Sequence, residues 1–214
     1  QVKAMETGDV AALTTRQVAA LTTAQVQKGL TTDEIVALTT TQISSLSTDQ
    51  IQALTTNQVQ ALETRDLAAL TTRQVAALTT TQVQKGLSTD QIVALTTGQV
   101  AALATDQVVA LTTDQVKAIE TRDVAALSTA AVAALTTAQV QKGLSTDQVA
   151  ALTTAGIASL TTDQISKGLS TDQVIALRTG QIQALNTDQV QSLTTDQVKA
   201  METGDVAALT TRQV

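Results

Sequence analysis

An eight-residue repeat runs through the whole sequence, and it limits the chain to folds that are built from one small unit. The unit reads approximately Val-x-Ala-Leu-Thr-Thr-x-Gln, and its first position is an aliphatic residue that we call the anchor. From Val2 to Val214 the anchors divide the chain into 22 units of eight and four units of nine. The longer units contain Lys-Gly, at Gly29, Gly86, Gly143 and Gly168.

A second, longer period lies above the first. Three blocks align with one another, and they begin at positions 7, 64 and 121. The first two blocks each contain six units of eight and one of nine, and the third is longer by two units of eight and one of nine. Residues 199–214 then repeat residues 3–18. We therefore predict one continuous solenoid over residues 1–214, a segment of a longer array. Its predicted superrepeats are 7–63, 64–120 and 121–202, with a restart at 203.

The unit predicts a short α-helix followed by a break. Eight residues advance about 800° along a helix, so an unbroken helix would turn its apolar stripe by about 80° in every unit. A β-strand does not fit, because Val and Leu lie three positions apart instead of two. Ala and Gln both favour helices. We therefore expect an all-α solenoid, or superhelix, with one very short helix in every eight or nine residues.

The pair of threonines marks the place where each helix begins. The second Thr never varies, from Thr7 to Thr211, whereas the first is replaced by Ala104 and Arg178 in two of the units. Because an N-cap residue needs a side-chain acceptor, this difference predicts the second Thr as the N-cap. The alternative places the first Thr at the N-cap and Gln three residues later, which makes a capping box.

Other residues indicate how the helices end and stack. In the Lys-Gly units we expect the glycine just after the helix, with a positive φ, and the lysine in the last turn. The residues that follow the anchors alternate loosely between apolar and polar, which favours a coil of three to four helices, or about 28 residues. An α-hairpin solenoid with two helices per repeat is the alternative, although the seven units of the first superrepeat do not divide into pairs.

Composition excludes several kinds of function. The chain has 13 basic and 19 acidic residues, a net charge of −6, and no aromatic residue, His or Cys. We expect no nucleic-acid binding, because there is no basic stripe and no ring to stack on a base. No apolar run approaches the roughly 18 residues that span a membrane. Without His, Cys or Tyr we expect no enzyme, and we assign no catalytic, cofactor-binding or metal-binding residue.

Two polar features remain as candidate binding groups. The near-constant Gln, as in Gln17, Gln25 and Gln42, either forms a buried ladder between coils or is solvated in the first turn. Pairs of carboxylates also lie near four helix starts. Calcium binding is one interpretation of these pairs, and compensation of the helix dipole is the simpler one. The pairs are Glu6 and Asp9, Glu63 and Asp66, Glu120 and Asp123, and Glu202 and Asp205.

Arrays of the form LTTxQVxAL resemble the repetitive regions of very large bacterial surface or adhesin-like fibre proteins. The resemblance extends along the whole chain and rests on this one simple motif. It implies an extracellular or cell-surface filament, fibre or stalk. The implied partners are copies of the chain itself and the cell surface or extracellular matrix. A repeat-type binding or adhesion module is the alternative function, and an ice-binding array of threonines is a minor one.

Overall fold

Short helices are the regular structure of this chain. The computed structural model describes residues 2–211 and 213, so the anchor Val214 lies outside the described residues. In the part that it describes there are 22 α-helices, one 3₁₀-helix and three π-helices, and no strand. The chain divides into two compact units, residues 1–103 and 104–214, and each is described by itself.

Unit 1 contains thirteen of these elements. They are η1 (Val2–Ala4), α1 (Thr7–Ala11), α2 (Thr15–Ala19), α3 (Thr23–Gly29), α4 (Thr32–Ala37), α5 (Thr40–Ser44), α6 (Thr48–Ala53), α7 (Thr56–Ala61), α8 (Thr64–Ala68), α9 (Thr72–Ala77), η2 (Gln82–Gly86), α10 (Thr89–Val93) and α11 (Thr97–Ala101).

Unit 2 contains the other thirteen. They are α12 (Thr105–Ala110), α13 (Thr113–Ala118), α14 (Thr121–Val124), α15 (Thr129–Ala134), η3 (Gln139–Gly143), α16 (Thr146–Ala151), α17 (Thr154–Ser159), η4 (Gln164–Gly168), α18 (Thr171–Ile175), α19 (Thr179–Ala184), α20 (Thr187–Ser192), α21 (Thr195–Ala200) and α22 (Thr203–Ala208). The prediction of an all-α fold with one very short helix per unit is confirmed.

The helices begin one residue earlier than we predicted. In α2 the first threonine is the N-cap: Thr14 Oγ1 accepts from the backbone N–H of Gln17 at 3.3 Å, and Gln17 Oε1 accepts from Thr14 N–H at 2.8 Å. The prediction of the second Thr as the N-cap is therefore wrong, and the capping-box alternative holds. The first position varies because half of the box survives its loss: Ala104 N–H still donates to Gln107 Oε1 at 2.9 Å.

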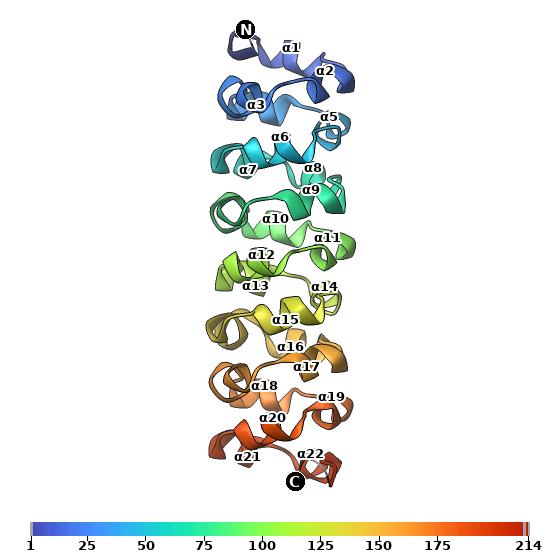
Figure 1. Cartoon of the computed structure of the whole chain (residues 1–214), viewed down its shortest axis with the longest axis vertical. Helices are drawn as coiled ribbons and strands as arrows, with labels where there is room; N and C mark the ends of the chain where they lie inside the picture. The colour runs from blue at the N-terminus through green and yellow to red at the C-terminus, as the bar shows by residue number, and fades with distance from the viewer. Residues whose placement is uncertain (1, 212, 214) are drawn as a thin grey trace. The chain divides into compact units, whose positions relative to one another are not determined.

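Three helices make one coil. Within each unit, contacts join every helix to the third helix further along the chain, as α2 to α5, α6 to α9 and α12 to α15 (Figure 1). Two units of eight and one of nine separate the anchors Val10 and Ile35, and three units of eight separate Ile35 and Val59. Three helices per coil lie within the predicted three to four, but the predicted length of about 28 residues is too long and the two-helix alternative is wrong. The residue after the anchor misled the prediction, because polar Gln52 and apolar Val36 are both exposed.

Aliphatic side chains fill the inside of each coil. Val10 and Ile43 are 0% exposed and Leu38 is 1% exposed. Burying such a side chain contributes about 1.5–3 kcal/mol. Helices of four to seven residues, as in α14 and α3, are unstable alone in water. Each helix therefore owes its stability to the coils next to it.

A π turn absorbs the extra residue of the nine-residue units. Leu87 N–H donates to the carbonyl of Gln82, five residues back, at 3.1 Å. Leu144 N–H and Gln139 O repeat this bond at 2.9 Å. Such i to i+5 bonds widen one turn so that it holds one more residue. The helix thus lengthens internally, and the next helix still begins in its place in the coil.

The glycine of these units serves close packing instead of an unusual backbone angle. In the part of the chain that the structure describes, no glycine has a positive φ, so that prediction is wrong. A Cβ placed on Gly86 would lie 3.1 Å from Val59 Cβ and 3.3 Å from Thr56 O, both on α7 in the preceding coil. A side chain there would press on the backbone of α7.

Candidate functional site

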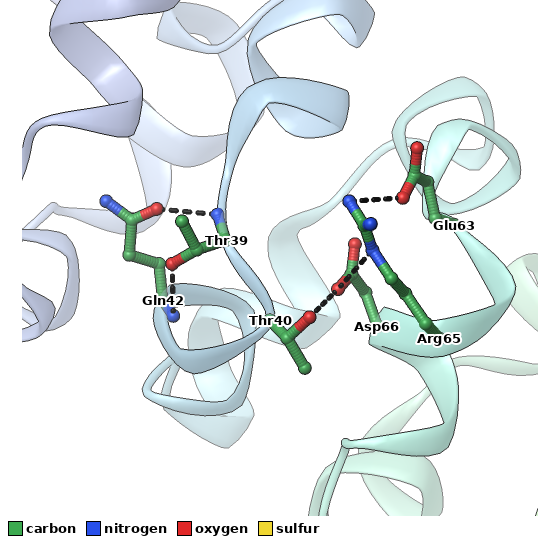
Figure 2. A network of polar contacts seen from close by, with 6 residues as sticks. All are labelled: Thr39, Thr40, Gln42, Glu63, Arg65 and Asp66. Atoms are coloured by element: carbon green, nitrogen blue, oxygen red, sulfur yellow. Dashed lines mark hydrogen bonds and ion pairs between the residues drawn. The ribbon is translucent and has the colours of Figure 1, made fainter.

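The side-chain amide of the recurring Gln makes hydrogen bonds to two helices at once. Gln42 is the third residue of α5, and its Oε1 accepts from Thr39 N–H at 2.6 Å, which completes the capping box (Figure 2). Its Nε2 donates to Val10 O at 3.1 Å and to Leu13 O at 2.6 Å, at the end of α1 in the preceding coil. One side chain therefore joins the start of one helix to the end of another.

This arrangement satisfies backbone groups that short helices leave unpaired. The last carbonyls of an α-helix have no partner within the helix, and in helices this short they are a large share of all carbonyls. A primary amide offers one acceptor oxygen and two N–H donors, so it serves both helix ends. Gln42 is only 2% exposed, so water does not replace these bonds easily.

The same bonds recur throughout both units, and we call them the glutamine ladder. In each rung Nε2 lies 2.6–2.8 Å from the carbonyl oxygen of the Leu or Ile that follows a helix of the preceding coil. The rungs of unit 1 are Gln42, Gln50, Gln58, Gln74, Gln82, Gln91 and Gln99. Those of unit 2 are Gln139, Gln148, Gln164, Gln173, Gln181, Gln189, Gln197 and Gln213. The buried-ladder interpretation of the Gln residues is therefore right for these positions.

Two of the glutamines named from the sequence make only the capping half of the arrangement. Gln17 and Gln25, in the first coil of unit 1, accept from Thr14 N–H and Thr22 N–H, each at 2.8 Å. Gln17 is exposed and Gln25 is half-buried, unlike the buried glutamines of the ladder. The ladder position therefore works fully only where a preceding coil lies beneath it.

The ladder is interrupted where another residue takes the place of Gln. In α17 the residue is Gly156, which has no side chain to donate, and its own N–H donates to Thr153 Oγ1 at 3.0 Å. In α8 the residue is Asp66, which is 0% exposed. An ionised carboxylate has no N–H, so it cannot donate to the α4 carbonyls of Ile35 and Leu38 that a Gln would reach.

Asp66 makes a different bond between the coils. Thr40, the first residue of α5, donates its hydroxyl proton to Asp66 Oδ1 (Figure 2). Arg65 Nε lies 3.7 Å from the same oxygen, and Arg65 Nη2 pairs with Glu63. Asp66 Oδ2 is buried and has no hydrogen-bond partner. We call Thr40, Glu63, Arg65 and Asp66 the Asp66 cluster.

The chemistry open to the Asp66 cluster is limited. Calcium takes six to eight oxygen ligands, and in the described part of the chain no three acidic, His or Cys side chains come together to hold a metal ion. The Arg65 side chain is 67% exposed, so solvent screens its attraction to Asp66. The cluster is therefore best understood as a structural link between α5 and α8.

The other predicted carboxylate pairs lie at helix starts. Asp9 Oδ2 accepts from Glu6 N–H at 3.2 Å, and Asp205 Oδ2 accepts from Glu202 N–H at 3.4 Å. In unit 2, Arg122 Nε lies 3.5 Å from Asp123 Oδ1, as in the Asp66 cluster. The capping interpretation therefore describes the pairs Glu6–Asp9 and Glu202–Asp205, and Asp123 lies in the first turn of α14, where its charge suits the helix dipole. The sequence did not predict the bond from Thr40 to Asp66. The one signal for this site is the Arg that precedes both Asp66 and Asp123.

Among the residues that the structure describes, no helix has the length and apolar character to cross a bilayer.

The fold and the ladder together define a class, that of all-α tandem-repeat proteins with a solenoid arrangement of short helices. Within this class, the chain belongs to the ALTTAQ repeat family, which matches seven overlapping segments between residues 2 and 201. The segments are 2–40, 29–64, 59–97, 93–118, 116–154, 150–179 and 168–201. The broader prediction of a tandem-repeat family is thereby confirmed.

Two further comparisons give little. No curated protein matches the sequence. The crystal structure of the leucine-rich repeat-containing protein LegL7 from Legionella pneumophila is similar over 99% of this chain and 78% of that one. The identity is 9% and the TM-score is 0.26, so this likeness carries no argument about the fold or the function of the chain.

Proposed function

We propose that the chain is a structural repeat protein that forms part of an extracellular or cell-surface filament, fibre or stalk. Copies of the chain associate end to end or laterally to build it. The proposal assigns the chain no catalysis and no cofactor. It gives the chain the role of a spacer whose length is set by the number of coils.

One observation supports this proposal more than any other, and it is the glutamine ladder. Each coil meets the next through the same amides, carbonyls and aliphatic side chains, as at Gln50, Gln82 and Gln173. Such an interface is nearly independent of position, which makes stability a sum over neighbouring coils. A structure of this kind lengthens by adding coils, whereas a globular core stops growing at a fixed size.

Electron microscopy tests the proposal directly. Negatively stained chain, imaged over a hundredfold range of concentration, should show uniform fibres or rods that lengthen or thicken as concentration rises. Light scattering on the same samples should report a rising mass. Compact monomers at every concentration would contradict the proposal.

A control separates native fibres from misfolded aggregates. Fibres built from folded coils should keep the helical circular dichroism of the dilute chain, and they should disappear in the urea concentration that unfolds it. Fibres with a β-type spectrum would count as amyloid and not as support. The location is tested separately, by protease treatment of intact source cells followed by detection with an antibody against the chain.

A further inference from the structure

Within the described part of each unit, the helix contacts join a coil to the coils immediately next to it. Within each unit, the helix contacts join elements three apart in the order of the chain, such as α6 with α9 and α16 with α18. The side-chain bonds of the glutamine ladder also reach only into the preceding coil, for example from Gln91 to Val59 O and from Gln164 to Val132 O. Removing one coil from the edge of a unit therefore breaks one interface and leaves the rest intact.

The polypeptide also runs through the coils in order. The chain enters a unit in its first coil and leaves it in its last, so tension applied to the chain acts first on an outer coil. In a globular core many distant segments must separate together, and unfolding is all-or-none. Here the cost of opening is divided into nearly equal parts, one for each interface between coils.

We propose that the chain lengthens under tension one coil at a time and so acts as an elastic element. Each step releases the three repeat units of one coil, such as those from Val10 to Ile35 or from Ile35 to Val59. At about 3.5 Å per extended residue, one step adds roughly 80 Å of contour length. The proposal concerns single chains, so it does not depend on whether copies of the chain form fibres.

The interruption at Gly156 gives the steps of unit 2 different strengths. At this position of α17 the ladder bond to the α14 end, at Val124 and Leu127, is missing because glycine has no side chain. The next ladder residue, Gln164, makes the usual bond to Leu135 O at 2.6 Å. The coil that contains α17 should therefore separate from the preceding coil at a lower force than a coil whose ladder bonds are all present.

Optical-tweezers measurements on the complete chain, held by handles at its two ends, test the proposal. The sequence contains no cysteine, so one cysteine introduced at each end attaches the handles specifically. We expect a series of small extensions, each corresponding to the three repeat units of one coil or to a small multiple of them. One or two large extensions, each releasing half of the chain or more at once, would overturn the proposal.

A pair of variants links the steps to the ladder. Gly156→Gln supplies the missing amide and should raise the force of the step in which the coil that contains α17 separates from the preceding coil. The matched control, Ala155→Gln, adds the same side chain at the exposed neighbouring position and should leave every step unchanged. An equal effect of both variants, or a rise in all steps together, would show that the coils do not open separately.

Discussion

The glutamine that recurs in most of the repeat units is the residue on which the joining of coils depends. Replacing Gln42 by Met keeps the volume of the side chain but removes its bonds to Val10 O and Leu13 O. We expect the free energy of unfolding to fall by about 2–4 kcal/mol, because buried carbonyls lose their donor. Urea denaturation followed by circular dichroism measures the change. Thr41→Ala, at the exposed position beside it, is the control, and a similar loss in both variants would contradict the role of the ladder.

At Asp66 the opposite change can be made, because a Gln introduced there would add a ladder bond that the protein lacks. Asp66→Gln supplies the N–H groups that the carboxylate lacks and removes an oxygen, Oδ2, that is buried without a partner. We expect a gain of about 1 kcal/mol in the free energy of unfolding. Asp66→Ala removes the link to Thr40 without adding a rung, and should destabilise the protein. Stabilisation by Ala and not by Gln would mean that burial of the charge, and not the missing rung, governs this position.

The helix start is where prediction at the scale of single residues failed. The invariance of the second Thr predicts it as the N-cap, but in the structure it is the first residue inside the helix. Its side chain is exposed in many repeats, as at Thr72 and Thr154. The first Thr can vary because Gln maintains half of the capping box. The invariance of a residue among the repeats therefore does not identify the N-cap.

A pair of single substitutions distinguishes the two threonines. Thr71 is the N-cap of α9, and its Oγ1 accepts from Gln74 N–H at 3.3 Å. Thr71→Ala should lower the free energy of unfolding by about 0.5–2 kcal/mol. Thr72 is the exposed first residue of α9 and is not its N-cap, so Thr72→Ala should cost less. Thermal denaturation measures both losses. A larger loss in Thr72→Ala than in Thr71→Ala would favour the second Thr as the N-cap.

Among the helices, the π turn with its glycine is the element that the sequence described incompletely. The Lys-Gly pair correctly marked four unusual helices, but a glycine after a helix normally indicates a positive φ. The actual requirement comes from the neighbouring coil, as in the close approach of Gly86 to Val59. A contact between residues a whole coil apart in the sequence cannot be inferred before the number of helices per coil is known.

Alanine substitution at two glycines tests the packing role. Gly86→Ala places a methyl group 3.1 Å from Val59 Cβ and against the Thr56 carbonyl, and should destabilise the fold by about 1–3 kcal/mol. Gly98→Ala is the matched control, because its nearest atom outside the helix is 3.8 Å away, and alanine there should be neutral or stabilising. Equal losses in both variants, measured by urea denaturation, would argue against close approach as the reason for Gly86.

At the scale of the molecule, the sequence predicts the class of fold but not the length of one coil. The eight-residue period implied short stacked helices, and the structure has them. The number of helices per coil depends on how aliphatic side chains fill the space inside it, and a repeat of identical units contains no signal for that number. The residues after the anchors alternate with a period of about 3.5 units, and a coil of that length is too long by about half a unit.

Hydrogen exchange should show how far a local change spreads. Gln148 joins α16 to the carbonyls of Val116 and Ile119 next to α13. In Gln148→Met we expect faster amide exchange in these two helices and their immediate neighbours within unit 2, and unchanged exchange around Gln197, because each coil is coupled only to the next one. A uniform increase throughout unit 2 would indicate a single cooperative block.

The three-helix coil also explains a difference in length between the blocks of the sequence. The third superrepeat exceeds the others by two units of eight and one of nine, and these three units are one whole coil. Duplicating or deleting a segment of that size leaves every remaining helix against a partner from the same side of the stack. Gaining one or two units instead would move every later helix to another of the three places in the coil. We therefore expect insertions and deletions of whole coils to be tolerated better than those of one or two units.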